Sequence, residues 1–327
     1  MVYDTVAGGR TKYLGEKSEA MTPVIAVIGS IVVDLPLILP RPAISGETLK
    51  VRSPGLNLGG KAVNQGLQAL LCGAQPALVG KVGQDALGDW ARAELARFRF
   101  SASGVGTADA PTSCAVPIIE GSNQYILHVP GANAQVTPAD IAASHPLWKD
   151  SRWLLVQGEI PAEASARAAE LMHQQQGTVI CDPAPAGSMT PELLRQADVL
   201  TPNAEELRVL SGVDGGGLGE QVERVWEAYP GLSMLIVTLG AQGVWFQERG
   251  KPGRQIPPPS VEAADPTAAG DAFNGALVAA LASGSNPLDA CTLGCCAGAL
   301  AATAAGSAKS LAPQEAIRAL WRATYCQ

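Results

Sequence analysis

Residues 265–271 read DPTAAGD, a run of small side chains that ends in an acid, directly before the alanine-rich apolar segment AFNGALVAALA. Ala and Gly let backbone amides approach a ligand closely, and the first turn of a following helix offers free N–H groups and positive dipole. The pattern indicates an anion-binding turn with the carboxylate of Asp271 beside it. A phosphate would repel this carboxylate unless the carboxylate takes a proton from the group that attacks the phosphate. The chemistry suggested is phosphoryl transfer to a hydroxyl; the alternative is that Asp271 only caps a helix start.

The composition is that of a globular protein with room for one large or two ordinary domains. The chain has 327 residues, 47% of them hydrophobic, and a net charge of −7. Because no cluster of Lys and Arg is present, we expect neither a nucleic acid nor a membrane as partner. The seven cysteines form no C-x-x-C pair, which suits reduced thiols in a cytoplasm and gives no reason to expect a structural metal.

Proton transfer is expected to rest on carboxylates, since none of the three histidines lies in a catalytic spacing. Residues 1–22 are polar and mixed in charge, so we expect a disordered extension before a domain that covers residues 23–327. Residues 290–308 carry no charge, but their Ala, Gly, Cys and Thr favour a tightly packed buried helix over a membrane span.

Short runs rich in Val, Ile and Leu alternate with segments of helical period. The expected strands are 24–33, 153–156, 178–181, 198–200 and 234–239, and the expected helices are 63–71, 86–97, 162–175, 204–210 and 221–228. Continuously apolar strands that alternate with helices predict an α/β fold, a doubly wound and mainly parallel sheet. Ligands of such sheets lie beyond the carboxyl ends of the strands. The residues to examine are therefore Asp34, Gln157, Glu159, Asp182, Asn203 and Gly240.

Residues 34–58 and 112–130 do not follow this pattern. Pro and Gly recur in both stretches, and polar and apolar residues nearly alternate along them. Alternation of this kind is typical of small antiparallel strands with one wet face. We expect the two stretches to come together as one small β-sheet, a lid over the ligand edge of the main sheet.

The segment 55–62, GLNLGGKA, has the spacing of a Walker A loop but ends in Ala62, which offers no hydroxyl to Mg²⁺. A true P-loop is therefore not expected. Its glycines still let the backbone approach a small polar ligand, and Lys61 and Asn64 add donors suited to sugar hydroxyls. No G-x-G-x-x-G follows a strand, so a dinucleotide-binding enzyme lacks its main signal.

Two long segments, residues 59–88 and 265–277, resemble the two signature segments of the ribokinase-like carbohydrate kinases, also called the phosphofructokinase-B type. The likeness extends from about residue 24 to about 315 and is greatest to the ribokinase group. Seven shorter segments agree in order: IGSIVVD at 28–34, SGETL at 45–49, PGANAQVTP at 130–138, QGEIP at 157–161, CDPAPA at 181–186, TPNAEEL at 201–207 and TLGAQGVW at 238–245.

The resemblance implies that Asp271 is the general base that removes the proton of the attacking sugar hydroxyl. It also implies that backbone amides stabilise the transferred group, those of Ala268, Ala269, Gly270 and Asp271.

The same resemblance implies sites for a sugar, for ATP and for Mg²⁺. The sugar site comprises Asp34, Gly60, Lys61, Asn64, Glu159 and Asp271; the nucleotide site comprises Asn203, Thr238, Gly240 and Gly243. Asn203 and Glu206 match an N-x-x-E segment that arranges Mg²⁺, through water. Glu206 as a solvated helix residue, and Asp34 as a strand-end turn, are the alternatives.

Many relatives are activated by a monovalent cation, usually K⁺. The matching positions are Asp265, Thr267, Ala301, Ala304, Gly306 and Ser310. Three residues depart from the pattern of the family: Val32 stands where the ribokinase group usually has Asn, Ala62 where it has Gly, and Pro266 where it has Thr. Val32 cannot bond a sugar hydroxyl, which bears on the choice of sugar, while Pro266 removes an N–H beside the cation site.

The sequence thus predicts an ATP-dependent sugar kinase that phosphorylates a primary hydroxyl, of ribose or a related pentose. The alternatives are a nucleoside kinase or a fructose-type kinase of the same fold, and a sugar-binding sensor without catalysis. The resemblance also implies a homodimer that pairs through the lid.

Overall fold

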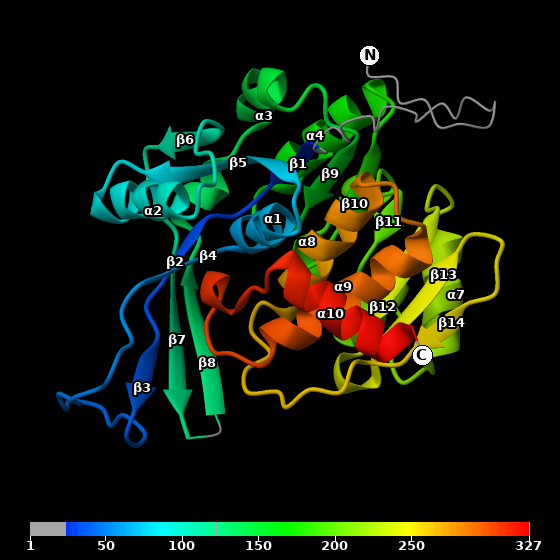
Figure 1. The fold of residues 1–327 in the computed structure, drawn as a ribbon. Helices are drawn as coiled ribbons and strands as arrows, with labels where there is room; N and C mark the ends of the chain where they lie inside the picture. Colours follow the sequence, from blue (N-terminus) through cyan, green and yellow to red (C-terminus); the bar gives the residue numbers. More distant parts are fainter. Residues whose placement is uncertain (1–23, 122, 327) are drawn as a thin grey trace, which may run out of the picture.

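The computed structural model describes residues 24–121 and 123–326, so the extension expected at residues 1–22 lies outside the described residues. In the described part a nine-stranded sheet lies between two layers of helices, and a five-stranded sheet projects from one end of it (Figure 1). The predicted α/β class, a mainly parallel sheet with helices on both faces and a second small sheet, is confirmed.

The large sheet is parallel from β6 to β12 and antiparallel at its other end. Its order is β14 (Arg254–Ile256), β13 (Val244–Glu248), β12 (Met234–Thr238), β11 (Val199–Leu200), β10 (Thr178–Cys181), β9 (Trp153–Val156), β1 (Val24–Ile28), β5 (Gln75–Gly83) and β6 (Val105–Ala108). Strand β5 continues the sheet beside β1, with Val24 opposite Gln75. The antiparallel pairs β12–β13 and β13–β14 close the edge.

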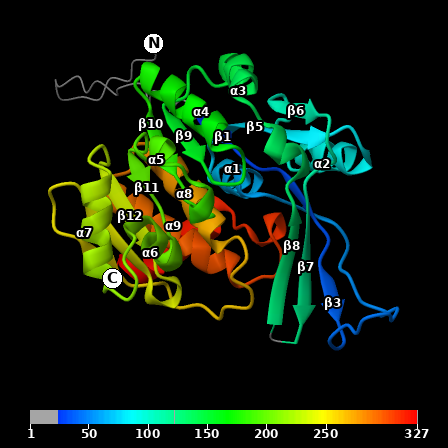
Figure 2. The same cartoon turned by 180° about the vertical axis from the view of Figure 1, so that it is seen from behind.

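Two hydrophobic cores cover the two faces of this sheet. Alternate residues of β1 enter different cores, Ile25 and Val27 one and Ala26 and Ile28 the other, as expected for a strand buried on both faces. The first core holds α1 (Lys61–Leu71), α2 (Ala86–Arg97), α8 (Ala269–Ala282), α9 (Pro287–Ala301) and α10 (Gln314–Tyr325). The second holds α3 (Pro138–Ser144), α4 (Ala162–Gln174), α5 (Pro191–Leu194), α6 (Ala204–Ser211) and α7 (Leu218–Ala228), which are labelled in Figure 2.

The prediction of one strand over residues 24–33 is wrong. Strand β1 ends at Ile28, and β2 (Val32–Asp34) belongs to the small sheet. Between them, the side chain of Asn133 accepts from the N–H of Ile31 and donates to its carbonyl, at 3.1 Å each. Because a side chain satisfies the backbone of Ile31 here, the chain can leave one sheet and enter the other without a buried unpaired amide.

The two stretches expected to form one small sheet do so. It comprises β2, β3 (Leu37–Leu39) and β4 (Asn57–Gly59) from the first stretch with β7 (Cys114–Glu120) and β8 (Asn123–Val129) from the second. Their pairing is mixed, since β7 runs parallel to β2 and β3 but antiparallel to β8. The expectation of antiparallel strands is therefore only partly right.

Five short 3₁₀ helices occur in loops of the described residues: η1 (Gly131–Gln135), η2 (His145–Leu147), η3 (Ala186–Ser188), η4 (Gly240–Gln242) and η5 (Ala308–Ser310). Residues 290–301 of the uncharged stretch belong to α9, which is largely buried as expected, but the helix ends at Ala301 and residues 303–305 are exposed. None of the helices in the described part of the chain has the length and apolarity needed to cross a bilayer.

Helices α1 and α8 approach closely at Gly275. A methyl group on Gly275 would lie 2.3 Å from the carbonyl oxygen of Gln65 and 2.7 Å from the Cβ of Gln68. Glycine is therefore required for these two helices to bring their first turns together, and those turns carry the residues of the site described below.

We expect Gly275→Ala to lower the free energy of unfolding by about 1–3 kcal/mol, because the added methyl group forces α1 away from α8. Gly219→Ala is the control: Gly219 also lies in a helix, but a methyl group there meets nothing within 4 Å. Better helix propensity should raise the stability of that variant by up to about 1 kcal/mol. Urea denaturation of both variants measures the difference, and equal stabilities would contradict a tight α1–α8 contact.

Candidate active site

Polar residues gather where the strands of the large sheet end, as predicted. Gln157 follows β9, Asp182 follows β10, Asn203 follows β11, and Thr238 ends β12. The main chain joins the last two, since Asn203 and Thr238 form an isolated parallel bridge. The first turns of α1 and α8 bring further polar groups to this edge, where Gln65 of α1 donates both to Asp182 and to Asp271 of α8.

The turn before α8 has the geometry of an anion-binding site. Ala268 adopts a left-handed conformation with φ of 61°, which is strained for a residue with a side chain. Among the described residues, no protein acceptor takes the N–H of Ala268, Gly270 or Asp271. The N–H of Ala269 donates to the carbonyl of Pro266 at 3.1 Å, so three of the four expected amides are free.

The carboxylate of Asp271 is buried in the first turn of α8, with 8% of the residue exposed. Its Oδ2 accepts from Asn64 Nδ2 at 2.9 Å, and its Oδ1 accepts from Gln65 Nε2 at 3.1 Å. Burial raises the pKa of Asp271, while the charge of Lys61 and these two hydrogen bonds oppose the rise. Such a carboxylate is a competent proton acceptor, held in one orientation.

Two groups near Asp271 offer hydrogen bonds to a ligand. The Oδ1 of Asn64 is buried and has no hydrogen-bond partner in the described structure, although its Nδ2 holds Asp271. Burial alone would lower the pKa of Lys61. The negative charges of four nearby carboxylates outweigh burial and raise the pKa above its ordinary value, so the ammonium stays charged; they belong to Asp271, Asp182, Glu159 and Glu206. An orphaned amide oxygen beside a charged donor fits a polyhydroxylated ligand, because a sugar hydroxyl can donate and accept at once.

The far side of the candidate sugar site contains Asp34 and Glu159, which two serines hold. Ser307 Oγ donates to Asp34 Oδ2 at 2.9 Å, and Ser30 Oγ donates to Glu159 Oε2. Burial raises the pKa of Asp34 to about 6, against the hydrogen bond from Ser307 and with help from the charges of Glu159 and Asp271. Asp34 ends β2 and also takes a hydrogen bond from a distant segment, at Ser307.

Gly60 stands before α1 with φ of 94°, and a methyl group on it would lie 2.6 Å from the carbonyl oxygen of Ser30. Ser30 Oγ accepts from the N–H of Lys61 at 2.9 Å. The glycine-rich segment 55–62 therefore contains the short strand β4 and the start of α1, and β4 belongs to the small sheet, whereas a P-loop follows a strand of the large sheet.

The expected nucleotide and Mg²⁺ residues lie at the ends of β11 and β12. Asn203 and Glu206 form a capping box: Asn203 Oδ1 accepts from the N–H of Glu206, and Glu206 Oε2 accepts from the N–H of Asn203, each at 2.8 Å. Burial raises the pKa of Glu206. Gly240 and Gly243 have positive φ, and a methyl group on Gly243 would lie 2.0 Å from the carbonyl oxygen of Ile256.

No group of three or more His, Cys, Asp or Glu side chains within residues 24–121 and 123–326 has the arrangement of a metal site. Glu206 nevertheless fits Mg²⁺, because this ion keeps several waters and takes one or two carboxylates together with substrate phosphates. The capping box uses Oε2 alone, which leaves Oε1 without a hydrogen-bond partner among the described residues.

The segments expected to hold a monovalent cation come together around Asp265. Its carboxylate accepts from the N–H of Thr267 at 2.9 Å and from the N–H of Gly306 at 3.3 Å, which lowers its pKa despite partial burial. Ala301 accepts from the N–H of Ala304, and Ser310 donates to the carbonyl of Ser307. Pro266 has no N–H to donate, but the loop does not need one there, because the carboxylate of Asp265 accepts from Thr267 and Gly306.

Several polar residues of the site escaped the sequence analysis. Gln65 stands directly after Asn64 in the chain and is fully buried, but no sequence pattern shows that its amide reaches two carboxylates. Ser30 and Ser307 lack any signal of their own. Val32 and Ala62, the two departures near the sugar site, are both buried, and Val32 pairs with Gly59 in the small sheet.

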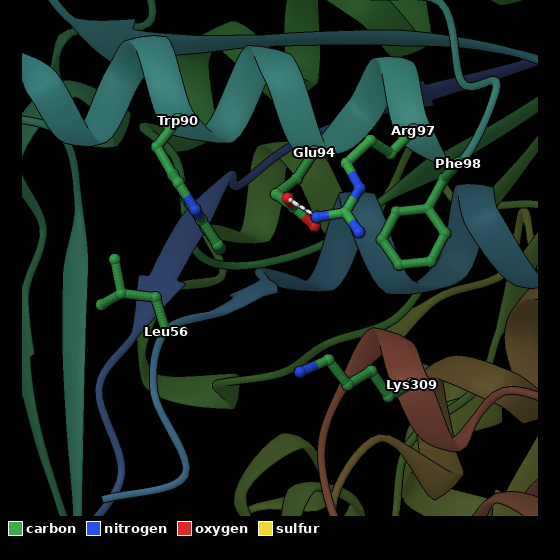
Figure 3. A pocket seen from close by; sticks show the side chains of 6 residues that line it. All are labelled: Leu56, Trp90, Glu94, Arg97, Phe98 and Lys309. Carbon is green, nitrogen blue, oxygen red and sulfur yellow. Dashed lines mark hydrogen bonds and ion pairs between the residues drawn. The ribbon is translucent and has the colours of Figure 1, made fainter.

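A cavity of about 650 Å³ has none of the expected site residues in its lining. Its lining comes from α2, from the segment before β4 and from η5, and comprises Leu56, Trp90, Glu94, Arg97, Phe98 and Lys309 (Figure 3). Glu94 forms an ion pair with Arg97 one turn along α2, and Lys309 Nζ donates to Asn57 Oδ1 at 2.8 Å. Asn57 itself pairs with Asp34 in the small sheet.

Comparison with known proteins gives consistent matches over nearly the whole chain. Residues 23–314 match the family described as pfkB family carbohydrate kinase. A ribokinase of Haemophilus influenzae is 30% identical over 89% of this chain and 96% of its own. The crystal structure of a ribokinase from Thermotoga maritima is 30% identical, covers 92% of this chain and 99% of its own, and has a TM-score of 0.81. A ribokinase of Arabidopsis thaliana, complexed with ribose and ATP, is 25% identical over the same shares with a TM-score of 0.83.

The raised pKa of Asp34 predicts a pH-dependent stability. In the folded chain the carboxyl group of Asp34 stays protonated up to about pH 6, whereas in the unfolded chain it loses its proton near pH 3.8. Between these values the folded state binds more protons, so the free energy of unfolding falls as pH rises. We expect Asp34→Asn to be more stable than the wild type near neutral pH by about 1–2 kcal/mol, with the advantage lost below about pH 4. Urea denaturation at several pH values measures it.

Asp85→Asn is the control, because folding lowers the pKa of Asp85 whereas it raises that of Asp34. Asp85 caps α2, and hydrogen bonds from Thr112 and Gly88 outweigh burial and lower its pKa. Its stabilising contribution is present above the ordinary pKa and disappears as pH falls. This variant should be less stable than the wild type near neutral pH; equal behaviour of both variants would refute the assignment of Asp34.

Proposed function

Because the chain belongs to the pfkB family of carbohydrate kinases, we propose that it transfers the γ-phosphoryl group of ATP to a primary hydroxyl of ribose or a related pentose. The kinase class follows from the family, and ribose is the substrate to which its named relatives point. The observation that carries the proposal is the buried carboxylate of Asp271, which stands beside free amides at the start of α8.

Asp271 is the general base in this proposal. It accepts the proton of the sugar hydroxyl as the hydroxyl oxygen bonds to the γ-phosphorus and the bond to the bridging oxygen of ADP breaks. Asn64 and Gln65 hold the carboxylate, so that the carboxylate does not have to reorient when the hydroxyl arrives. The unpartnered Oδ1 of Asn64 and the charged Lys61 orient the sugar together with Asp34, Gly60 and Glu159.

The amides of Ala268, Gly270 and Asp271 stabilise the charge on the transferred group, aided by the positive end of α8. Ala269 takes part in the turn rather than in this anion hole, because Pro266 accepts its N–H. Glu206 and Asn203 would hold Mg²⁺ through water; this ion neutralises phosphate charge when bound. Thr238, Gly240 and Gly243 would cradle the nucleotide.

A monovalent cation, K⁺ in the first place, is proposed behind the anion hole, at Asp265, Thr267, Ala301, Ala304, Gly306 and Ser310. The lowered pKa of Asp265 supports it, because a permanently charged carboxylate attracts a cation. We also propose a cytoplasmic location, which the seven free thiols suit.

The first experiment measures ADP release from Mg-ATP over ribose, deoxyribose, fructose, other sugars and nucleosides, with and without K⁺. We expect one pentose to be preferred. Asp271→Asn should keep the fold and sugar binding but lose about 10²–10⁴-fold in kcat, since a positioned base contributes this much.

Other results of the same panel would change the proposal. Preferred turnover of a nucleoside or of fructose would move the substrate class within the family. Sugar binding without turnover of any compound would support a sensor. An Asp271→Asn variant with the kcat of the wild type would remove Asp271 as the base.

A homodimer through the small sheet is proposed from the exposure of β8. Tyr125, Ile126, Leu127 and Val129 each expose more than half of their surface, and they lie on both faces of the strand because side chains alternate. Exposed apolar residues gathered in this way are typical of protein interfaces.

We expect light scattering to give twice the chain mass for the wild type and a monomer for Leu127→Asp, because a carboxylate would be buried in the interface. Leu147→Asp changes an equally apolar, exposed residue outside the small sheet, in η2, and should remain dimeric. A wild-type monomer, unchanged by sugar, would disprove this interface.

A further inference from the structure

A buried amide links two carboxylates beneath the candidate active site. Gln65 is fully buried in α1, and its Nε2 donates to Asp271 Oδ1 at 3.1 Å and to Asp182 Oδ2 at 2.7 Å. Its Oε1 accepts from Nε2 of Gln157, also fully buried, at 2.8 Å. One side chain from α1 therefore joins the start of α8 to the ends of β10 and β9.

The hydrogen bond from Gln157 determines which way the amide of Gln65 points. Because Gln157 donates, the carbonyl of Gln65 must face it, and the NH₂ group must face the carboxylates. An amide NH₂ has two hydrogens, one for each acid. Glycine at position 29 leaves room for the side chain of Gln157, because a methyl group there would lie 2.0 Å from Gln157 Oε1.

We propose that Gln65 is a positioning residue for the phosphoryl transfer, which holds Asp271 in the orientation that accepts the proton of the sugar hydroxyl. This inference rests on the proposed function. Asn64 fixes Oδ2 of Asp271 and Gln65 fixes Oδ1, so the carboxylate cannot rotate about its Cβ–Cγ bond without losing a hydrogen bond. Neither residue needs to touch phosphate for this task.

The charges around Gln65 explain why an amide serves here. Asp271 and Asp182 repel each other and also feel the charges of four nearby groups. The ammonium of Lys61 on the same helix lowers the pKa of both acids. The other three are carboxylates, which favour protonation: Glu159 after β9, Glu206 on α6 and Asp34 on β2. Burial raises the pKa of Asp182 to about 7 and also raises that of Asp271, while the hydrogen bonds of Gln65 oppose both shifts. Loss of Gln65 would therefore favour protonation of the base as well as its rotation.

Gln68 provides a matched control on the same helix. It is also fully buried, but its amide bonds the backbone of Ala312, with Nε2 to O at 2.9 Å and Oε1 to N at 3.3 Å. Met has a similar length and no amide, so Gln65→Met and Gln68→Met remove comparable polar groups from α1.

The experiment compares the pH profiles of kcat and the KM for sugar in both variants and the wild type, on the sugar that the wild type prefers. We expect Gln65→Met to lose about 10–100-fold in kcat with little change in KM, because misplaced reacting groups cost this much. The acidic limb of its profile should move to higher pH. Gln68→Met should keep the kcat and pH profile of the wild type, and we expect thermal unfolding to show that both variants are less stable than the wild type.

Gln157→Met tests the same idea if Gln65→Met does not fold, because it leaves Gln65 in place and removes the group that orients its amide. A smaller loss of kcat with the same shift in the pH profile is expected. If the wild type turns over a sugar and the Gln65 and Gln157 variants behave like Gln68→Met, the positioning role is wrong and the proposed function stands. A wild type that phosphorylates no sugar overturns the proposed function and this role together.

Discussion

A carboxylate that is buried beside other carboxylates is the constraint on which this structure depends. Asp271 lies within the electrostatic reach of Asp182 and Glu159, and burial alone would drive it to take up a proton. The compensation comes from one turn of α1, which supplies a cation from Lys61 and amides from Asn64 and Gln65. Helices α1 and α8, some two hundred residues apart in sequence, must therefore meet at their first turns. The backbone contact at Gly275 allows them to do so.

The second requirement is that the small sheet lie next to the edge of the large sheet where its parallel strands end. The chain achieves this by changing sheets within a few residues, from β1 to β2, where Asn133 pairs the backbone of Ile31. Asp34 thereby leaves the large sheet and faces Asp271 from the small one, near enough to influence its charge. Asp34 thus approaches this edge from the small sheet, whereas Lys61 and Asn64 come from α1 and Asp271 from α8.

The sequence predicted the sheet class, and it singled out the small-residue turn before Asp271, because both depend on local patterns. Apolar runs reveal β9, β10 and β12, and small residues before an acid reveal the turn at Asp271. Strand β5 was missed because Gly80, Lys81 and Gly83 interrupt its apolar run. The contacts of Gln65 could not be predicted, since they join residues more than a hundred positions apart. For Asn203 and Glu206 the pattern is ambiguous, because the same N-x-x-E spacing forms a helix capping box.

The loop before α10 joins parts of the site that the rest of the chain keeps separate. Gly306 donates to Asp265 on the phosphate side, and its neighbour Ser307 donates to Asp34, which lies 273 positions earlier in the chain. A contact of this sequence separation forms only when almost the whole chain is present. During synthesis on the ribosome, then, the large sheet can assemble strand by strand while the site remains incomplete. A chain that ends before this loop would therefore leave the carboxylate of Asp34 without its hydrogen bond from Ser307, even if the large sheet had formed.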